Sequence, residues 1–303
     1  DSCIACLQGC VANMYAGNPV CCLTNPFLGH EAEPLEKAEE PKKVMVIGGG
    51  VAGLSAAFIA KERGHEVTLY EAGDVLGGNM RLAAYPPGKG DITNMIRSYI
   101  HRCQKDGVKI VMNCEVTPEL IKEEKPDSVI IATGSKTLIL PIEGIDNPAI
   151  IHGSDLLDGK RAAGKKVLVV GGGMVGCETA AFLGEQEHDV TVIEFRDTVG
   201  ADVIHEHRVY LMKDFEDYGI KEITGAKVCK FYEDGVEYET ADGVRHESRG
   251  YDSVILSMGF RNYNPLEEKI KDLVPETHVI GDAIRARRAL DATKEAYEVA
   301  SRI

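Results

Sequence analysis

The 303-residue sequence predicts an α/β protein built from two Rossmann-like dinucleotide-binding domains, one inserted in the other, with a cysteine-rich segment at the N-terminal end. A glycine turn of the form Gly-Gly-Gly-x-x-Gly follows an apolar β run at 48–53 and again at 171–176. All corresponding positions of the two copies are 123 residues apart. Five of the nine cysteines lie within the first 22 residues. A repeated nucleotide-binding unit and a local thiol cluster therefore define the expected organisation.

Composition places the chain among ordinary globular proteins and argues against two classes of partner. Hydrophobic residues make up 44% of the chain, charged residues 27%, and the formal net charge is −14. A nucleic-acid binder or a protein held on an anionic membrane surface needs a basic face, so we expect neither partner. No apolar run reaches the ~18–20 residues of a membrane-spanning helix. The sequence begins with Asp and shows no signal-peptide pattern, from which we expect a fragment or a processed chain.

The cysteine-rich segment, predicted over residues 1–30, has the spacing of a thiolate cage. Its pattern is Cys3-x2-Cys6-x3-Cys10, followed after eleven residues by Cys22. Soft thiolates select iron–sulfur clusters, zinc or Cu(I). Three thiols within eight residues favour a compact polynuclear centre, with zinc or a redox-labile tail as alternatives, and Cys21 remains an ambiguous neighbour of Cys22. The isolated cysteines predict buried free thiols: these are Cys103, Cys114, Cys177 and Cys229.

An acidic stretch with two prolines, Glu31 to Lys43, has no apolar periodicity and predicts a linker over 31–42. The first nucleotide unit follows it. Lys43–Ile47 reads as a strand, 54–63 as a helix, and Glu66–Tyr70 as a second strand that ends at Glu71. This order of strand, glycine turn, helix, strand and acid is the dinucleotide-binding pattern.

Each residue of the first turn has an expected role. Gly48 permits the tight turn, Gly50 lets a pyrophosphate approach the backbone, and Gly53 lets the helix pack close to the strand. The free N–H groups at the helix start then face the phosphates, and Glu71 accepts hydrogen bonds from a ribose.

The second unit repeats this arrangement. A strand at Lys166–Val170 leads into the turn, and a strand at 190–193 ends at Glu194. Gly171, Gly173 and Gly176 correspond to the three glycines of the first unit. Two copies with equal spacing to a terminal acid favour two ligand sites over glycine turns without a ligand.

Three further segments fit two such sites. Residues 128–134 and 253–259 each read as a strand that runs into a glycine. A strand from His278 ends in Gly281-Asp282, and a helix through Ala300 follows it. We expect Asp282 to bind a hydroxylated chain and the start of this helix to offer N–H groups to an anion.

The whole arrangement resembles the flavoprotein oxidoreductases with two dinucleotide sites, the pyridine-nucleotide-reductase type. The resemblance implies FAD at the first turn and a nicotinamide nucleotide at the second. It also implies a discontinuous FAD-binding domain over 41–150 and 266–303, an NAD(P)H-binding domain over 151–265, and a β-hairpin within Tyr232 to Tyr251 of the latter.

The subclass depends on the cysteines. Disulfide reductases of this build carry a redox cysteine pair, but 72–89 contains no cysteine and Cys177 stands alone. The cysteine pattern, Asn25-Pro26, His30-Glu31 and the segments 76–79 and 84–89 are instead similar to the C-terminal half of iron–sulfur members of the old yellow enzyme class. Those members include 2,4-dienoyl-CoA reductase, 2-enoate reductase and trimethylamine dehydrogenase.

This resemblance assigns residues to three cofactor sites and predicts no acid–base catalytic residue. The residues implied for FAD are Gly48, Gly50, Val51, Ala52, Gly53, Glu71, Ala72, Gly78, Asn79, Arg81, Val116, Ala132, Thr133, Gly134, Gly281 and Asp282. Those implied for NAD(P)H are Gly171, Gly173, Met174, Val175, Gly176, Glu194 and Gly259. Those implied for a 4Fe–4S cluster are Cys3, Cys6, Cys10 and Cys22.

The resemblance also implies a function, the input of electrons from NADH through FAD and the cluster to an FMN barrel. That barrel, which is absent from this sequence, would reduce an activated C=C bond such as that of a 2-enoate or a 2,4-dienoyl-CoA. The expected partner is that barrel or an equivalent redox partner, and the sequence is compatible with a homo-oligomer. The accessible thiols fit a reducing cytoplasm.

Two alternative functions remain. The first site could hold ADP structurally, as in trimethylamine dehydrogenase-like proteins, or the chain could be a standalone NADH:acceptor reductase.

Several other polar residues have open roles. Glu194 favours NADH over NADPH, although Arg196 could partly offset the repulsion of a 2′-phosphate. Glu178 could face the nicotinamide or solvent, and Lys89 could lie near the flavin. Three arginines could bind phosphate and two histidines could bind a metal, or all five could lie on a solvated surface; they are Arg285, Arg287, Arg288, His205 and His207.

Overall fold

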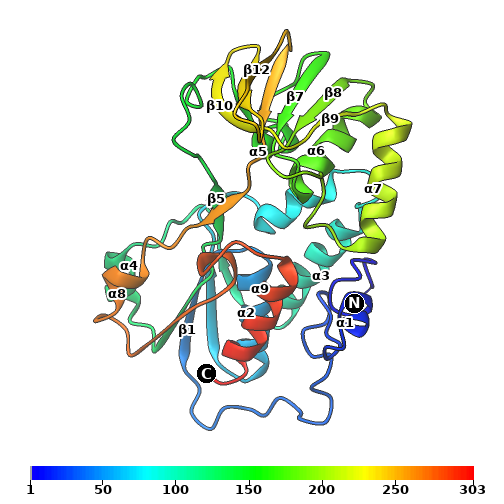
Figure 1. Cartoon of the computed structure of the whole chain (residues 1–303). Helices are drawn as coiled ribbons and strands as arrows, with labels where there is room; N and C mark the ends of the chain where they lie inside the picture. Colours follow the sequence, from blue (N-terminus) through cyan, green and yellow to red (C-terminus); the bar gives the residue numbers. More distant parts are fainter. Residues whose placement is uncertain (1) are drawn as a thin grey trace. The chain divides into compact units, whose positions relative to one another are not determined.

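The computed structural model describes residues 2–303 and divides them into two compact units, each built on a five-stranded parallel sheet (Figure 1). The first unit comprises residues 2–84, 91–136 and 261–303, and the second unit comprises 85–90 and 137–260. Asp1, part of the predicted cysteine-rich segment, lies outside the described residues. The predicted α/β class with two Rossmann-like sheets is confirmed.

The sheet of the first unit has the strand order β15-β4-β1-β2-β3. Its strands are β1 (Lys43–Ile47), β2 (Glu66–Tyr70), β3 (Lys109–Val111), β4 (Ser128–Ile131) and β15 (Glu276–Val279). Its helices are α1 (Val11–Tyr15), α2 (Val51–Glu62), α3 (Asp91–Lys105), α4 (Pro118–Glu124), α8 (Glu267–Ile270) and α9 (Ala289–Ala300), with 3₁₀ turns η1 (Gly78–Ala84) and η2 (Gly281–Ala283).

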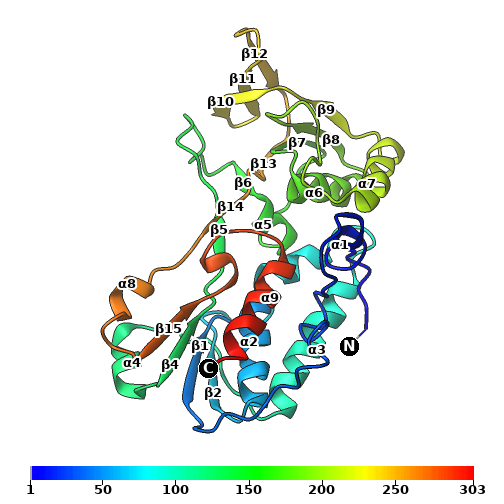
Figure 2. The same cartoon turned by 60° about the horizontal axis from the view of Figure 1, so that its bottom comes forward.

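Strand β1 explains why this sheet is buried on both faces. Val44 and Val46 pack into the apolar cluster formed with α2, α3 and α9, while Met45 and Ile47 pack into a second cluster on the opposite face. Because side chains alternate along a strand, a continuous apolar run predicts such two-sided burial. Helices α2 and α9 lie side by side against the first face (Figure 2).

The second unit has the strand order β6-β13-β7-β8-β9, in which four strands repeat the first unit. The edge strand differs, because β6 precedes the glycine-loop strand in the chain whereas β15 follows it. The elements of the second unit are β6 (Ile151–His152), α5 (Gly153–Leu157), β7 (Lys166–Val170), α6 (Met174–Glu185), β8 (Asp189–Ile193), α7 (His205–Asp217), β9 (Lys221–Ile223) and β13 (Ser253–Leu256). Val167 and Val169 of β7 pack against α6 and α7. Leu168 and Val170 pack on the other face, where an antiparallel sheet covers them.

That antiparallel sheet lies where the sequence predicts a hairpin. The structure forms β11 (Gly235–Glu239) and β12 (Arg245–Arg249) as the hairpin and adds β10 (Lys227–Tyr232) before it. The chain passes between the units through β5 (Ser135–Thr137) and β14 (Phe260–Asn262), which pair with each other.

The structure sets the starts of two expected helices. The helix expected from residue 54 begins three residues earlier, at Val51, directly after Gly50. The helix expected after Gly281-Asp282 runs to Ala300 and begins at Ala289. In the segment before it, Asp282 accepts the Arg287 N–H at 3.0 Å, and Asp291 accepts the Arg288 N–H at the helix start.

Within residues 2–303, no helix combines the length and apolar character needed to cross a bilayer.

Candidate functional site

The first glycine loop, residues 48–53, is sterically closed to larger residues at two positions. Gly48 has φ +108°, and a Cβ built on it would lie 2.3 Å from the carbonyl oxygen of Ala132. A Cβ on Gly53 would lie 1.9 Å from the carbonyl oxygen of Gly48. These contacts explain the first and third glycines as packing requirements of the strand–helix turn.

Glu71 holds this loop from the end of β2. Its Oε2 accepts the Gly49 N–H at 2.7 Å, and its Oε1 accepts the Gly73 N–H at 2.7 Å. A carboxylate offers about four acceptor positions, so both oxygens keep capacity for ribose hydroxyls. Glu71 therefore has a structural role that the sequence pattern alone does not reveal.

Other residues implied for FAD converge on the same end of the sheet. A Cβ on Gly78 would lie 3.1 Å from the Cα of Gly50, and a Cβ on Gly281 would lie 3.0 Å from the Cβ of Ala52. The backbone of the 3₁₀ turns at 78 and 281 thus approaches the glycine loop and the start of α2. At that start, Gly50 provides no side-chain cap and the first turn of α2 carries no acid. The uncapped N–H groups and the close glycine backbone fit the phosphates of a dinucleotide.

Ser135 links two of these residues and was missed in the sequence. Its hydroxyl donates to Asp282 Oδ2 at 2.8 Å, and it lies 3.4 Å from Asn79 Nδ2. The signal that could have found it is its position directly after Ala132-Thr133-Gly134. The polar side chains of Asn79, Ser135 and Asp282 therefore lie next to one another beside the glycine loop.

The remaining residues implied for FAD have mixed surroundings. Thr133 donates its hydroxyl hydrogen bond to the carbonyl of Tyr263, and Gly134, at φ +75°, has open space where a Cβ would point. Ala72 is exposed directly after Glu71, and Arg81 lies in η1. Val116 is buried in the apolar cluster beside Ile47, which leaves its backbone rather than its side chain for a ligand.

The second glycine loop, residues 171–176, has the same construction. A Cβ on Gly171 would lie 2.4 Å from the Ser257 carbonyl oxygen, and one on Gly176 would lie 1.8 Å from the Gly171 oxygen. Glu194 accepts the Gly172 N–H at 2.6 Å and the Arg196 N–H at 2.9 Å.

The start of α6 differs from that of α2. The Met174 N–H donates to Asp202 Oδ1 at 2.9 Å, so a carboxylate already lies at this helix N-terminus. Val175, next in the helix, accepts the Thr179 hydroxyl through its carbonyl at 2.7 Å. Gly259, at φ +99°, lies beyond β13, where its carbonyl accepts the Leu138 N–H at 2.9 Å.

Glu178 is neither a solvated helical acid nor unpaired. Its side chain is 10% exposed and forms an ion pair with Lys89. Lys89 belongs to the short segment 85–90, which groups with the second unit although the chain on both sides of it belongs to the first. The pair therefore fixes this segment to α6.

The four cysteines implied for the cluster lie in one neighbourhood of the first unit. Burial raises the pKa of the Cys6 thiol, and the negative charges of Cys22, Cys10 and Cys3 raise it further against a hydrogen bond from Gln8. The segment is anchored where the Tyr99 hydroxyl donates to the Leu23 carbonyl at 2.6 Å. Among residues 2–303, no three His, Cys, Asp or Glu side chains lie close enough together to hold a single metal ion.

Cys21 has surroundings different from those of Cys22. Its thiol lies 3.5 Å from Asn13 Nδ2, its N–H donates to the Gly9 carbonyl at 2.9 Å, and burial raises its pKa. A Cβ on Gly9 would lie 3.0 Å from the Cys21 sulfur. Cys22 contacts the Thr24 hydroxyl at 3.3 Å. Besides burial, the negative charge of Cys22 raises the pKa of Cys21, whereas Lys294 lowers it.

The isolated cysteines and the other polar candidates are only partly as expected. Cys103 and Cys177 are buried, but Cys114 and Cys229 are half-exposed, so the prediction of buried thiols is wrong for the latter two.

His205 is exposed and His207 half-exposed at the start of α7. Arg287 forms an ion pair with Glu295, whose carboxylate also accepts the Gly281 N–H at 2.7 Å.

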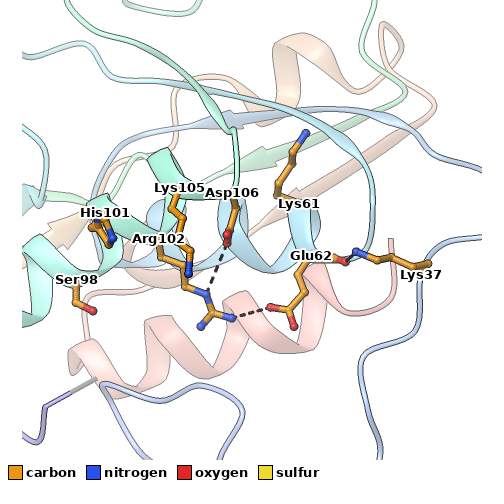
Figure 3. Close-up of a pocket in the computed structure, with 8 residues that line it drawn as sticks. All are labelled: Lys37, Lys61, Glu62, Ser98, His101, Arg102, Lys105 and Asp106. Carbon is orange, nitrogen blue, oxygen red and sulfur yellow. Dashed lines mark hydrogen bonds and ion pairs between the residues drawn. The ribbon is translucent and has the colours of Figure 1, made fainter.

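A separate cavity of about 670 Å³ lies in the first unit at the far ends of α2 and α3 (Figure 3). It contains no residue implied for a cofactor, and α2 is about 18 Å long, so the cavity is remote from the glycine loop. Arg102 points across it to Glu62 at 2.6 Å. Its lining is Lys37, Lys61, Glu62, Ser98, His101, Arg102, Lys105 and Asp106.

Comparison with known proteins identifies the family. The model of the pyridine nucleotide-disulphide oxidoreductases matches residues 42–280, and the chain belongs to this family of NAD(P)H-dependent flavin oxidoreductases. It is 34% identical to a cinnamate reductase of Clostridium sporogenes, over 99% of this chain and 45% of that protein. It is also 34% identical to an NADH oxidase of Thermoanaerobacter brockii, over 99% of this chain and 47% of that protein.

A solved structure agrees with these relatives. A 2-naphthoyl-CoA reductase in complex with 2-naphthoyl-CoA superposes with a TM-score of 0.94 at 33% identity, covering 99% of this chain and 46% of that one. The chain therefore spans about half the length of the relatives it matches, which are longer proteins with additional parts. The expected resemblance to the FAD- and NAD-binding part of old-yellow-enzyme-class reductases is confirmed.

Proposed function

We propose that this chain is the electron-input part of a larger reductase, taking electrons from NADH and delivering them through FAD and a 4Fe–4S cluster to an FMN barrel. We assign the FAD-binding domain to 41–150 and 266–303, most of which lies in the first unit, and the NADH-binding domain to 151–265, most of which lies in the second. The barrel reduces an activated C=C bond such as that of a 2-enoate or a 2,4-dienoyl-CoA. The names of the cinnamate reductase and the 2-naphthoyl-CoA reductase support this substrate class.

The observation that carries the proposal is the repeated acid–loop geometry. In both units an acid at the end of the second strand accepts the N–H of the middle glycine, at 2.7 Å for Glu71 and 2.6 Å for Glu194. Two loops held alike in one chain support two dinucleotides, one in each unit. When bound, FAD supplies hydride acceptance from NADH and one-electron transfer to a cluster.

The residues of this chain bind and orient rather than exchange protons. Gly50 and the start of α2 admit the FAD pyrophosphate, while Asp282 and Ser135 offer oxygen atoms to its hydroxylated chain. Glu194 accepts ribose hydroxyls of NADH at lone pairs that the Gly172 and Arg196 N–H groups leave free. A 2′-phosphate would meet this carboxylate, so we assign NADH rather than NADPH.

The thiol neighbourhood supports the cluster assignment. Cys22, Cys10 and Cys3 lie close enough to Cys6 for their charges to raise its pKa, which supports a set of four thiolates, one for each iron. Thiolates gathered without metal repel one another, so a positively charged cluster core would remove the repulsion.

An anaerobic absorption spectrum, recorded before and after NADH addition, tests the proposal. We expect flavin bands that NADH bleaches and a broad iron–sulfur absorption beneath them. A protein that carries ADP instead of FAD would overturn the electron-input role and support the structural-ADP alternative. Bleaching by NADPH alone would overturn the assignment of Glu194.

A matched pair of variants tests the fourth ligand. Cys22→Ser removes a proposed ligand, whereas Cys21→Ser changes the same atom one residue away. We expect iron content to fall to less than one quarter in Cys22→Ser and to stay at the wild-type value in Cys21→Ser. The reverse pattern would assign Cys21 as the ligand.

A further inference from the structure

A carboxylate lies at the N-terminus of α6, where the second glycine loop would receive a pyrophosphate. The Met174 N–H donates to Asp202 Oδ1 at 2.9 Å. A Cβ built on Gly173 would lie 3.5 and 3.6 Å from the two Asp202 oxygens. The carboxylate thus covers both the second glycine of the loop and the first N–H of a 12-residue helix.

The first unit provides an internal reference for this position. Asp202 is 123 residues after Asn79, the same offset that separates the two glycine loops. The two segments are also attached alike: Gly77 donates its N–H to the Gly49 carbonyl at 2.8 Å, and Gly200 donates to the Gly172 carbonyl at 2.7 Å.

At this equivalent position the two units differ in charge and contact. Asn79 is neutral and lies 3.4 Å from Ser135, and the N-cap residue of α2, Gly50, offers no side-chain cap. Asp202 is charged and directed at the helix start. At this position the two units therefore differ by one anion at a helix N-terminus.

We propose that Asp202 is an intramolecular competitor for the pyrophosphate of the nicotinamide nucleotide and so sets the affinity of the second site. This inference rests on the proposed function, because it takes the second loop as the NADH site. A helix N-terminus stabilises one anion, and a second anion at the same N–H group is repelled. Asp202 is exposed, so it can leave for solvent when the nucleotide enters.

The substitution Asp202→Asn copies the first unit and removes the competing charge. We expect it to lower the dissociation constant of NADH by about tenfold, the size of effect that one charge-assisted hydrogen bond commonly has. Asp202→Ala removes the carboxylate without an isostere and is expected to act in the same direction. Asp197→Asn is the matched control, because it removes one charge from the same loop and the Asp197 carboxylate lies beside Gly225.

Isothermal titration of the full chain with NADH, and separately with ADP-ribose, measures the effect. Tighter binding of both ligands by the two Asp202 variants, with less than a twofold change in Asp197→Asn, would support the inference. Unchanged or weaker binding by the Asp202 variants, in a chain whose wild type binds NADH, would overturn the inference and leave the proposed function intact. Equal tightening by Asp197→Asn would also overturn it, because general charge would then explain the effect. Absence of binding by every variant and the wild type would instead overturn the proposed function.

Discussion

The two glycine-loop units are alike in what builds the fold and differ in what a ligand would touch. Both have a five-stranded parallel sheet in which four strands follow the same order, a third glycine closed to any Cβ, and an acid that holds the loop. Ser135 and the Gly281-Asp282 turn belong only to the first unit, and Asp202 replaces Asn79 in the second. Packing demands the first and third glycines of both loops, and the unduplicated residues are those in which the two proposed sites differ.

The residues that follow Glu71 and Glu194 also combine a repeated backbone contact with different side chains. Ala72 follows Glu71, whereas Phe195 follows Glu194 and is 69% exposed. Both next residues, Gly73 and Arg196, donate their N–H groups to the acid. The backbone contact is thus repeated while the side chains have changed.

The largest expected effect comes from adding one methyl group to the third glycine of either loop. Gly53→Ala and Gly176→Ala each place a Cβ within 2 Å of a carbonyl oxygen of the same loop. We expect each to destabilise its unit by more than about 3 kcal/mol, because the neighbour is backbone and cannot move aside. Thermal unfolding, together with flavin content, measures this.

The two substitutions should also separate the units. Gly53→Ala is expected to lose flavin, whereas Gly176→Ala is expected to keep flavin and lose NADH binding. Gly90→Ala is the control, since its Cβ would meet nothing within 4 Å. Loss of flavin in Gly176→Ala to the same extent would show that the units do not act separately.

A smaller effect is expected from the ion pair that fixes segment 85–90 to α6. Lys89→Met leaves Glu178 as a carboxylate with a 10% exposed side chain and no cation. We expect a loss of about 1–3 kcal/mol in the free energy of unfolding, below the value for a fully buried pair because Lys89 is partly solvated. Urea unfolding measures it.

A double-mutant cycle decides whether the loss is specific to the pair. Lys89→Met with Glu178→Gln should recover part of the stability that Lys89→Met alone removes. Additive losses would contradict a direct interaction. Lys271→Met, which breaks an exposed pair with Glu268, is the control and is expected to change stability by less than about 0.5 kcal/mol.

Sequence reasoning was effective where the physics is local. Strands β1, β2 and β7 begin and end at the predicted residues, because apolar runs bounded by glycine and charge leave few alternatives. It failed where a contact distant in sequence decides the conformation. Ser135 bridges Asn79 and Asp282, and Lys89 pairs with Glu178 on a helix 89 residues away. None of these partners is marked by periodicity or motif spacing.

The smallest expected effect compares one buried thiol from each unit. Burial raises the pKa of both Cys103 and Cys177 to about 12. Folding keeps these thiols neutral, so their contribution to stability is complete below the unfolded-state pKa near 9 and is lost as pH rises from 9 to 12. At pH 8 we expect no alkylation of either residue by iodoacetamide, while the half-exposed Cys114 and Cys229 react, as peptide mass spectrometry would measure.

The variants Cys177→Ala and Cys103→Ala test how the free energy of unfolding depends on the ionisation of each thiol. Above pH 9 each thiol should steepen the fall in unfolding free energy by at most about 1.4 kcal/mol per pH unit, and each substitution should remove its own share. Equal changes in slope would mean that both units bury their thiols alike. A change for Cys103→Ala alone would mean that the second unit opens locally at high pH, exposing Cys177 before the first unit unfolds.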